Sequence, residues 1–542
     1  MSAIRKVLKL DPRDNVLVAL TPLMAGEAVS FADKEYFPAS AIPAKFKFVE
    51  RDIPAGGEIV MYGVVVGRAR EPIPAGGLLT TQNLQHDSGK HSLRSAAYKW
   101  NAPDVSRWAA QKFYGYRRTD GQVGTRNYWL VIPLVFCENR NVELLREAFE
   151  EELGYGKANP YRLQVRELIQ RRNRFAGEMR QEAASSPLFP HLDGIKFLFH
   201  QGGCGGTRED ARALCGLLAG YIHHPNVAGA TVLSLGCQNA EVSILQEELQ
   251  RRDPQSTKPV LIFDQQATGL ESTMLTRAIE KTFGALEEAN AVERSAAPLA
   301  ALTLGLKCGG SDGFSGISAN PAIGHTSDLL VALGGKTILS EFPELCGMEQ
   351  NIIDRSVNEQ VASRFVALMT SYAARAKAVH SGFDMNPSPG NIQDGLITDA
   401  MKSAGAARKS GTSPVMDVRD FPEYVTTAGL NLLCTPGNDV ECVTAQVGAG
   451  ANMVLFTTGL GTPTGNPIAP VIKVSTNKNL ATRMSDIIDL DAGSILSGES
   501  TVEDIGAALL DTVLEVASGR QHTKAEMLGQ NDFIPWKRGI SL

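Results

Sequence analysis

In residues 195–252 two short apolar runs each lead into a longer amphipathic stretch. In chain order they read IKFLFH (195–200), REDARALCGLLAGYI (208–222), ATVLSLG (230–236) and AEVSILQEELQRR (240–252). A short apolar run is typical of a buried strand, and a longer amphipathic stretch is typical of a helix. Their alternation predicts βαβ units and therefore a mostly parallel sheet covered by helices.

The same alternation continues on both sides of this segment. Upstream, the run NYWLVIPLVF (127–136) precedes the amphipathic VELLREAFEEEL (142–153). Downstream, a polar segment at 287–298 is followed by five more apolar runs separated by helical stretches. These runs are LTLGL (302–306), TILSEF (337–342), NLLCTP (431–436), MVLFTTG (453–459) and PVIKVST (470–476). We therefore predict two successive α/β domains, at 114–292 and 293–542.

The first 90 residues have a different sequence pattern. Short apolar runs alternate with turn residues, and the string IPAGG occurs twice, starting at Ile53 and at Ile73. Each copy is a Pro/Gly turn next to an apolar run, which predicts a small β domain at 1–90. The polar stretch that follows has loop composition, so we expect a linker at 91–113.

The amino-acid composition excludes several classes of protein. Hydrophobic residues make up 43% of the 542 residues and charged residues 21%, so the chain can bury a core and is not disordered. The formal net charge of -6 argues against a nucleic-acid partner. No apolar run approaches the ~20 residues that span a bilayer, and the first residues lack the apolar segment of a signal peptide. We expect a cytoplasmic protein with no nucleic-acid partner and no membrane partner.

Several cysteines follow directly on apolar runs. Those with a Gly or Pro beside them are Cys204, Cys237, Cys308 and Cys434, and Cys137 is similar without the Gly. The carboxyl ends of parallel strands meet at one edge of a sheet, and thiolates are soft ligands for iron or zinc. The alternative is that cysteine fills space in the core. For the set Cys204, Cys237 and Cys308 both interpretations stay open, while Cys215, Cys346 and Cys442 are interpreted as core residues.

Three glycine-rich turns also follow strands. They read QGGCGGTRED (201–210), KCGGSDGFSG (307–316) and TTGLGTPTGNP (457–467). Such turns can direct several backbone N–H groups at an anion. None has the spacing of a phosphate loop or of a dinucleotide fingerprint, so we expect neither ATP nor NAD. A carboxylate or polyol ligand suits them better, although glycine also serves simply to make tight turns.

Polar side chains near the same runs could act on a carboxylate ligand. An arginine fork such as Arg126 in GTRNY can hold a carboxylate through two hydrogen bonds. The alternative is that Arg126 pairs with Asp120 or caps a helix. An elimination beside a carboxylate needs a base, an acid and a cation. Candidate groups are Asn127, His200, Glu341, Glu344, Asn386 and Asn391; individually, His200 or Glu341 is equally well interpreted as a structural polar group.

These strings resemble the altronate and galactarate dehydratases. DGQVGTRNY, GCGGTRED, LGCQN, CGGSDGFSGISANP, EFPEL, NPSPGN, TPGND and TTGLGTP occur in the order seen in that family, and CGGSDG followed by SANP is highly specific. The resemblance extends from Gly115 to the C-terminus, and the β domain before it is similar to the small SAF-type (β-clip) domain of these enzymes. It implies an α/β fold with a SAF-like domain at 1–90 and mostly parallel, Rossmann-like sheets beyond it.

The resemblance also implies an activity. The family eliminates water across C2 and C3 of a sugar acid and depends on a divalent metal, so we expect Fe2+, with Mn2+ or an iron–sulfur cluster as alternatives. We also expect a homodimer joined through the middle domain. The residues assigned to catalysis are His200, Glu341 and Lys402. Those assigned to the substrate are Arg126, Asn127, Ser311, Asp312, Asn320, Asn386 and Asn391, and those assigned to the metal are Cys204, Cys237 and Cys308.

Two departures from the family pattern are visible. Thr80 and Gln82 stand in LTTQN, where many relatives have histidines, and Ala400 and Met401 precede Lys402 in DAMKSAG, where relatives have an acidic residue. We predict a dehydratase that converts D-altronate to 2-dehydro-3-deoxy-D-gluconate and water. The alternatives are galactarate or another sugar acid as substrate, a sulfolactate sulfo-lyase-like reaction, or a non-catalytic sugar-acid binding protein.

Overall fold

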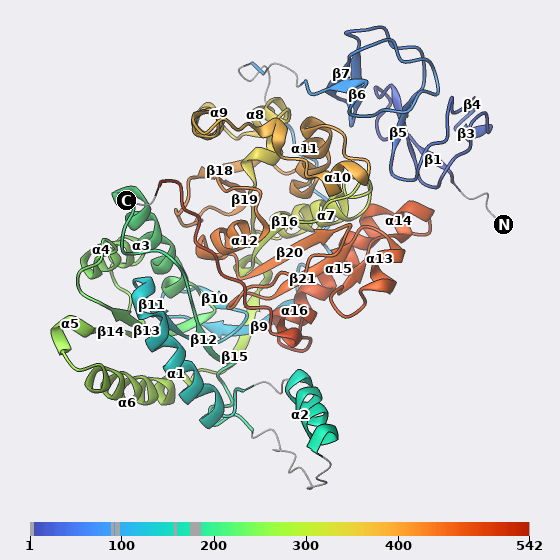
Figure 1. Cartoon of the computed structure of the whole chain (residues 1–542). Helices are drawn as coiled ribbons and strands as arrows, with labels where there is room; N and C mark the ends of the chain where they lie inside the picture. The colour runs from blue at the N-terminus through green and yellow to red at the C-terminus, as the bar shows by residue number, and fades with distance from the viewer. Residues whose placement is uncertain (1–4, 88–90, 93–97, 157–159, 174–185, 541–542) are drawn as a thin grey trace.

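Three regions follow one another along the chain in this computed structural model (Figure 1). It describes residues 5–87, 91–92, 98–156, 160–173 and 186–540. A small β domain comes first, an α/β domain with a four-stranded sheet second, and an α/β domain with a seven-stranded sheet third. Every strand pair in the two larger sheets is parallel, which confirms the predicted fold class. Among the described residues no helix combines the length and the apolar character that crossing a membrane requires.

The β domain owes its shape to the repeated IPAGG turn. Ile53 and Ile73 pair across an antiparallel bridge and are both buried. Gly56 and Gly76 each have φ of +77°, a conformation that glycine adopts without strain. The strands are β1 (Val7–Leu8), β2 (Val16–Ala19), β3 (Val29–Phe31), β4 (Lys34–Tyr36), β5 (Lys47–Val49), β6 (Glu58–Met61), β7 (Val64–Ala69) and β8 (Leu84–Gln85). The boundary expected at residue 90 lies outside the described residues.

The middle domain is a sheet of order β12-β11-β13-β14 covered on both faces. Alternate residues of β11 show why: Leu130 packs in one apolar cluster with α3, whereas Trp129 packs in another with α1 and α6. The strands are β11 (Tyr128–Pro133), β12 (Gly194–Phe197), β13 (Val227–Ser234) and β14 (Val260–Asp264). The helices are α1 (Asn139–Glu152), α2 (Pro160–Asn173), α3 (Arg208–His223), α4 (Val242–Arg252), α5 (Gln265–Thr268) and α6 (Glu271–Ala289).

The third domain contains a sheet of order β18-β19-β17-β16-β20-β21-β22. β17, β18 and β19 lie on one side of β16, and β20, β21 and β22 lie on the other. The strand order therefore reverses between β16 and β20. In such sheets ligands bind beyond the carboxyl ends of the strands at the reversal. The strands are β16 (Thr303–Cys308), β17 (Lys336–Leu339), β18 (Val415–Arg419), β19 (Gly429–Leu433), β20 (Met453–Thr458), β21 (Val471–Ser475) and β22 (Leu490–Asp491).

Helices cover both faces of this sheet. Ile323 of α7 and Leu509 of α15 pack together on one face in a single apolar cluster with strand residues. The helices are α7 (Ala319–Ala332), α8 (Glu349–Arg355), α9 (Glu359–Ala378), α10 (Pro389–Gln393), α11 (Asp399–Ala407), α12 (Asp439–Gly448), α13 (Lys478–Arg483), α14 (Ser494–Ser497), α15 (Val502–Ala517) and α16 (Lys524–Leu528).

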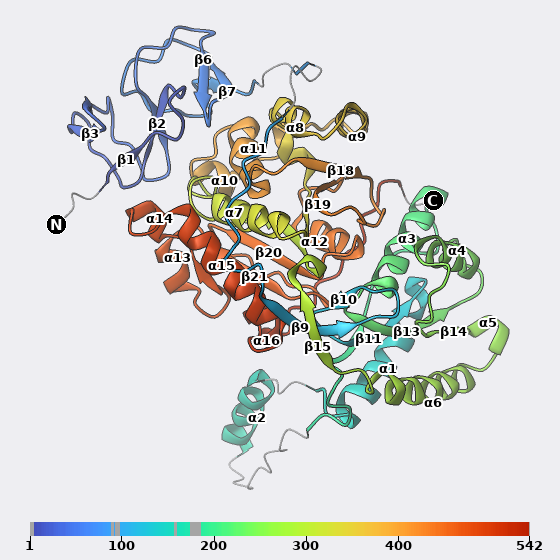
Figure 2. The same ribbon diagram turned by 180° about the vertical axis from the view of Figure 1, so that it is seen from behind.

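The segment expected to be a linker contacts the third domain in the part of it that the structure describes. Trp108 is buried in the apolar cluster of α7 and α15, and its indole N–H donates to Asp511 at 2.8 Å. Figure 2 shows this segment running beside both helices to β9. A third sheet, of order β10-β9-β15, then joins the larger domains. Its strands are β9 (Lys112–Arg117), β10 (Val123–Gly124) and β15 (Arg294–Pro298); β15 therefore lies in the polar segment at 287–298.

A buried ion pair ties the start of the middle domain to the last helix. Arg126 is fully buried, and its Nε and Nη2 donate to the two carboxylate oxygens of Glu526 at 2.7 and 3.1 Å. Its Nη1 donates to the carbonyls of Thr125 and Val516 at 2.7 and 2.9 Å. The guanidinium is therefore engaged with the scaffold, and its partner is Glu526 rather than Asp120.

We predict that Arg126→Met lowers the free energy of unfolding by about 3–5 kcal/mol, because it leaves the Glu526 carboxylate without its guanidinium. Denaturant unfolding measures the change. Arg520→Met is the matched control, since its pair with Glu515 is about half exposed and should cost no more than about 1 kcal/mol. Unchanged stability together with a fall in kcat/KM would instead make Arg126 a substrate-binding residue.

Candidate active site

The candidate site lies at the carboxyl edge of the seven-stranded sheet. β16 ends at Cys308 and continues into the glycine-rich turn at 309–313, while its neighbour β20 ends at Thr458. Gly309 N–H donates to the Thr457 carbonyl and Leu460 N–H to the Gly310 carbonyl, so the two turns are joined. The site therefore sits at the point where the strand order reverses.

Five buried ionic side chains meet there, and we call them the lysine–glutamate cluster. Its members are Lys307, Glu341, Glu344, Lys402 and Lys409, and the Cys308 thiol lies among them. Lys307 ends β16 with Cys308, the glutamates follow β17, and the other two lysines lie in and just after α11. Segments from residue 307 to residue 409 thus converge on one point.

The contacts within the cluster are short. Glu341 lies between two lysines: Lys307 contacts one carboxylate oxygen, and Lys409 Nζ lies 2.6 Å from the other. Lys402 Nζ lies 2.9 Å from Glu344. The Cys308 thiol accepts from Lys409 Nζ at 2.7 Å and donates to Glu344 at 3.3 Å. Charge-assisted contacts of this kind are the strong ones in a protein interior.

The electrostatics keep the Lys402–Glu344 pair ionised. Burial alone would raise the pKa of Glu344, but Lys402, Lys409 and Lys307 outweigh it and lower the pKa to about 2. Burial alone would lower the pKa of Lys402, but Glu344 outweighs it and raises the pKa. At neutral pH Glu344 is thus a carboxylate and Lys402 an ammonium group.

Glu341 occupies a strained position. Its φ of +66° lies in the left-handed region, which costs a residue with a side chain about 1–3 kcal/mol. Its N–H donates to the Thr435 hydroxyl at 3.0 Å, which helps to hold this conformation. The turn allows the carboxylate to reach back between Lys307 and Lys409.

A second group of polar residues adjoins the cluster. Asn386 accepts from Lys402 Nζ at 3.3 Å and donates to Asp399 at 3.1 Å. Burial raises the pKa of Asp399 to about 7. The ligand atoms of His86, Cys346 and Asp399 all lie within 4.8 Å of one another. His86 comes from the end of the β domain, so that domain contributes directly to this region.

Two sets of residues in this region could hold a metal ion. Cys308, Glu341 and Glu344 have ligand atoms within 4.8 Å of one another, but ammonium groups already contact them. In the other set, Asp399 Oδ2 is buried and accepts no hydrogen bond from the described residues. Imidazole, thiolate and carboxylate together suit Fe2+ or Zn2+, and three protein ligands leave a position for substrate. The set His86, Cys346 and Asp399 therefore fits a catalytic cation better.

A cavity of about 450 Å³ lies close to the cluster, since two of its lining residues contact cluster lysines. Its wall includes Asn386, which contacts Lys402, and Gly437, whose carbonyl accepts from Lys307 Nζ at 3.1 Å. Arg375, Lys537 and Arg538 also line it. Arg375 and Arg538 pair with Glu209 and Asp420, so the positive charge on this wall is partly compensated, and what remains favours a small anion.

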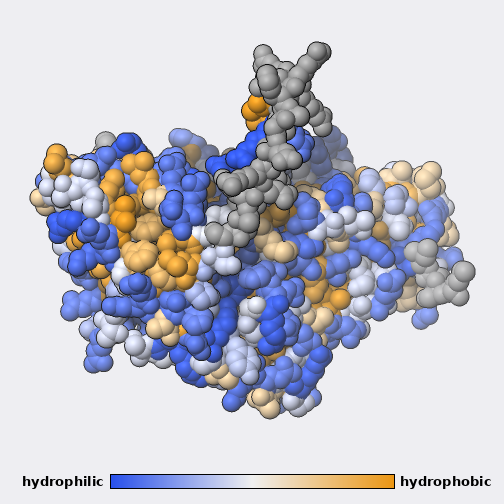
Figure 3. Space-filling view, turned by 90° about the horizontal axis from the view of Figure 1, so that it is seen from below, coloured by the Kyte–Doolittle hydropathy of each residue, from blue (hydrophilic) through white to orange (hydrophobic). Residues whose placement is uncertain are grey.

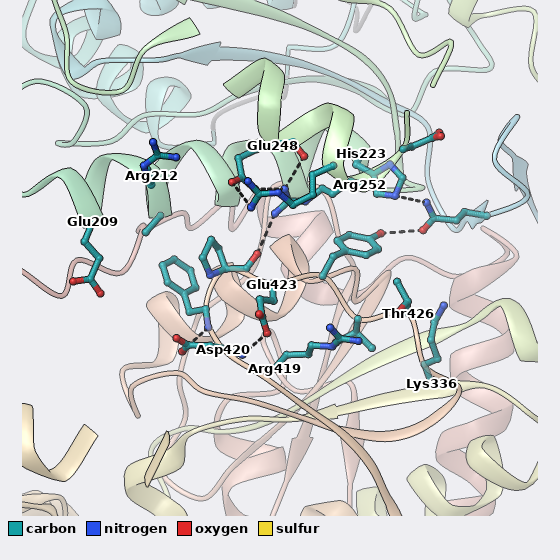
Figure 4. A pocket seen from close by; sticks show the side chains of 18 of the residues that line it. Glu209, Arg212, His223, Glu248, Arg252, Lys336, Arg419, Asp420, Glu423 and Thr426 are labelled. Carbon is teal, nitrogen blue, oxygen red and sulfur yellow. Dashed lines mark hydrogen bonds and ion pairs between the residues drawn. The ribbon is translucent and has the colours of Figure 1, made fainter. Parts of the chain in front are cut away.

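A larger cavity of about 900 Å³ lies between the middle and third domains (Figure 4). Its charged side chains largely engage one another: Arg252 donates to Glu248 at 2.8 Å, and Tyr424 donates to Gln122 at 2.9 Å. Lys336 lines this cavity and begins β17, so the cavity reaches the amino end of that strand, opposite to Glu341. The smaller cavity instead lies at the carboxyl edge of the same sheet, where Gly437 and Asn438 follow β19.

Some predicted residues meet near the cluster. Glu341 and Lys402 belong to it, and Asn386 contacts Lys402. Asn391 donates to the Ser311 carbonyl at 2.8 Å, and the buried Asp312 pairs with Lys45 of the β domain at 3.1 Å.

Other predicted residues lie elsewhere or are engaged with the scaffold. Asn320 donates to the Gly405 carbonyl at 3.0 Å and accepts from Thr457 at 2.6 Å. Asn127 hydrogen bonds to Asp193 and His191 in the middle domain. Arg126 is held by Glu526 of α16. His200 also lies there, and its two ring nitrogens bond to the Pro133 carbonyl and the Gly202 N–H. Burial lowers the pKa of His200 to about 4.

The three predicted metal-binding cysteines are divided between two sheets. Cys308 is buried in the lysine–glutamate cluster, whereas Cys204 and Cys237 are exposed beyond the four-stranded sheet and line two separate cavities. The expectation of one shared thiolate site is therefore corrected: β16 belongs to a different sheet from the strands before the other two.

Several functional candidates were missed from the sequence. Lys307 could have been identified from the sequence, because it immediately precedes Cys308 at a strand end. The sequence does not indicate a functional role for four others, because they lie in helical or loop-like stretches that only the tertiary fold brings together: Lys409, Asp399, His86 and Cys346.

Three family descriptions match the chain in order. They are an altronate/galactarate dehydratase SAF domain at residues 5–87, a D-galactarate dehydratase/altronate hydrolase second domain at 115–290, and a D-galactarate/altronate dehydratase C-terminal region at 299–541.

Similar proteins match over nearly the whole chain. An altronate dehydratase of Escherichia coli (strain K12) is 32% identical over 536 residues, covering 99% of both chains. One of Bacillus subtilis (strain 168) is 32% identical over 544 residues, covering 99% of this chain and 100% of that one. A galactarate dehydratase (L-threo-forming) of Escherichia coli (strain K12) is 32% identical over 504 residues, covering 91% and 89%.

Proposed function

The chain belongs to the D-galactarate/altronate dehydratase family, and on that premise we propose that it removes water from D-altronate to give 2-dehydro-3-deoxy-D-gluconate. The reaction class is that of a sugar-acid dehydratase, a hydro-lyase. The observation that supports the site is the buried lysine–glutamate cluster at the strand reversal, near a cavity whose wall carries Arg375, Lys537 and Arg538. Galactarate and other sugar acids are the alternative substrates.

The proposed elimination uses the two ends of the Lys402–Glu344 pair. Glu344 is an ionised carboxylate and accepts the proton from C2 of the substrate. Lys402 is an ammonium group held by Glu344 and Asn386, and it donates a proton to the departing C3 hydroxyl. An acid and a base 2.9 Å apart can act in turn on neighbouring carbons of one substrate.

The remaining cations stabilise the charge that develops. Abstraction of the C2 proton spreads negative charge onto the substrate carboxylate. Lys307 and Lys409 are fixed in place by Glu341, so their charges need little rearrangement during the reaction. A cation that stabilises the transition state more than the bound substrate accelerates the reaction.

A divalent cation fits this scheme beside the cluster. We propose that His86, Cys346 and Asp399 hold it, with Fe2+ first and Mn2+ as the alternative. When bound, it would supply Lewis-acid stabilisation for the substrate carboxylate. Asn386 links this set to Lys402 through its two hydrogen bonds.

We also propose a homodimer formed through the middle domain. Figure 3 shows hydrophobic residues gathered on the left of that view, the side that holds the middle domain in Figure 1. Partly exposed apolar side chains of α1 and α6 include Leu144, Ile279 and Phe283. Exposed apolar patches of this kind are typical of protein interfaces.

The catalytic proposal predicts that Glu344→Gln and Lys402→Met stay folded and lose 10²–10⁴-fold in kcat, the usual contribution of a general acid or base. Formation of 2-dehydro-3-deoxy acids from a panel of aldonates and aldarates, assayed anaerobically with ferrous iron, measures this. Lys377→Met, an exposed substitution on α9, should be fully active.

Three outcomes would contradict the catalytic proposal. Full activity of Glu344→Gln would remove the assigned base. Release of sulfite from sulfolactate in place of dehydration would change the reaction. Binding without turnover by the metal-loaded wild-type protein would make the chain a sugar-acid binding protein.

The metal proposal predicts that chelation abolishes turnover and that ferrous iron restores it. His86→Ala should need at least tenfold more iron for half-maximal recovery, because loss of one of three protein ligands weakens binding. His380→Ala, an exposed control, should behave as wild type. Full activity after exhaustive chelation would rule out a catalytic metal, and normal iron affinity in His86→Ala would rule out this ligand set.

The dimer proposal predicts a molar mass of two chains in solution by light scattering. Phe283→Glu on α6 should halve it, because a charge would be buried in the interface. Val379→Glu, at an exposed position after α9, should leave the mass unchanged. A wild-type monomer, or a dimer that tolerates Phe283→Glu, would be inconsistent with this interface.

A further inference from the structure

Three cysteines lie at the carboxyl edge of the middle sheet, away from the lysine–glutamate cluster. Cys137 follows β11, Cys204 follows β12 and Cys237 follows β13. β11 lies between the other two strands in the sheet, and all three are parallel. Their carboxyl ends therefore lie side by side, and the three turns emerge from adjacent positions.

Backbone hydrogen bonds hold these turns against one another. Phe136 N–H donates to the Gly202 carbonyl at 3.0 Å, and Ala240 N–H donates to the Gly203 carbonyl at 3.0 Å. The loop before Cys204 is thus joined to the residue before Cys137 and to the turn that contains Cys237. Gly203 has φ of +98°, and a Cβ there would meet the Leu134 carbonyl at 2.4 Å. This contact requires glycine and brings the Cys204 loop onto the end of β11.

The thiols are close enough to influence one another. Burial raises the pKa of Cys137, and the thiols of Cys204 and Cys237 raise it further. Gln266 also donates to the Cys237 sulfur at 3.2 Å. Hydrogen bonds to thiolate ligands are typical of iron–sulfur sites, where they tune the cluster.

Core packing does not explain these cysteines. Buried cysteine commonly fills space, and Cys215, Cys434 and Cys442 are buried here. Cys137, Cys204 and Cys237 are instead exposed and reduced. Exposed thiols grouped at one edge of a sheet are available to bind a soft metal.

The spacing favours a polynuclear centre over a single ion. Zinc binds each thiolate at ~2.3 Å, so one ion would hold three sulfurs within ~4 Å of one another. Among the described residues, the groups of three candidate ligands whose atoms all lie within 4.8 Å of one another do not include these cysteines. A cluster in which each thiolate binds a different iron accommodates wider spacing.

We propose that Cys137, Cys204 and Cys237 bind an iron–sulfur cluster through three thiolates, with one iron left without a protein thiolate. A cavity of about 690 Å³ lies beside Cys204, and its wall includes Trp536 and Lys537. The same two residues line the cavity that lies close to the lysine–glutamate cluster. The cavity beside Cys204 would give a small oxygen ligand access to the Cys204 side of the site, and the C-terminal segment lies between it and the smaller cavity of the third domain.

Anaerobic reconstitution of the full chain with ferrous iron and sulfide tests this proposal. We expect the broad visible absorption of sulfide-bound iron, with iron and acid-labile sulfide in equal amounts once the one ferrous ion assigned to His86, Cys346 and Asp399 is subtracted. Cys137→Ser, Cys204→Ser and Cys237→Ser should each lose most of it. Cys215→Ala, a buried cysteine in α3, is the matched control and should keep it. Reconstitution should also protect three thiols of the wild-type protein from alkylation.

Two results would overturn the proposal. Absorption and sulfide that persist in the triple serine variant would show iron–sulfur material bound elsewhere. A wild-type chain that takes up no labile sulfide under these conditions would show that the three thiols do not form a cluster site. Neither readout uses turnover, so the result is independent of whether Glu344 and Lys402 carry out the dehydration.

Discussion

Three ammonium groups and two carboxylates are buried together at one edge of the seven-stranded sheet, and an uncompensated buried charge costs several kcal/mol. The surrounding structure satisfies that constraint. The left-handed turn at Glu341 brings its carboxylate between Lys307 and Lys409. α11 holds Lys402 against Glu344, and the β domain docks nearby through Lys45 and Lys47, which contact Asp394 and the Gly395 carbonyl. The same pairing places ionised groups next to Asn386 and Gly437, which line the smaller cavity.

In each of the two α/β domains, parallel strands bring residues that are distant in the sequence to the carboxyl edge of the sheet. The chemical groups at that edge differ between the domains. In the third domain these residues are buried ion pairs beside a cation-lined cavity, and in the middle domain they are exposed thiols. The C-terminal segment around Trp536 and Lys537 forms part of the wall of a cavity on each side. Its stacking on Tyr372 and the Arg538–Asp420 pair hold it between the domains.

The parallel sheets could be predicted from the sequence because alternation of apolar runs and amphipathic stretches is a local pattern. The glycine-rich turns and Glu341 could be identified for the same reason, since strand ends are visible in the sequence. The grouping of the cysteines was wrong because the sequence does not reveal which strands share a sheet: Cys308 follows β16, while Cys137 follows β11 beside the strands of Cys204 and Cys237. Lys409 and His86 could not be found, since only the tertiary fold brings a helix end and the β domain to the cluster. The docked Trp108 segment has loop composition, so its contacts were equally invisible.

The proposed dehydration requires that the sugar acid binds beside Lys402 and Glu344, and not in the larger cavity between the domains. A crystal structure with a bound 3-deoxy aldonate, which lacks the hydroxyl to be eliminated, tests it most directly. We expect the carboxylate of the analogue to lie within hydrogen-bond distance of lysines of the lysine–glutamate cluster, with C2 facing Glu344. An analogue bound instead beside His223 and Arg252 in the larger cavity, with the lysine–glutamate cluster unchanged, would contradict it.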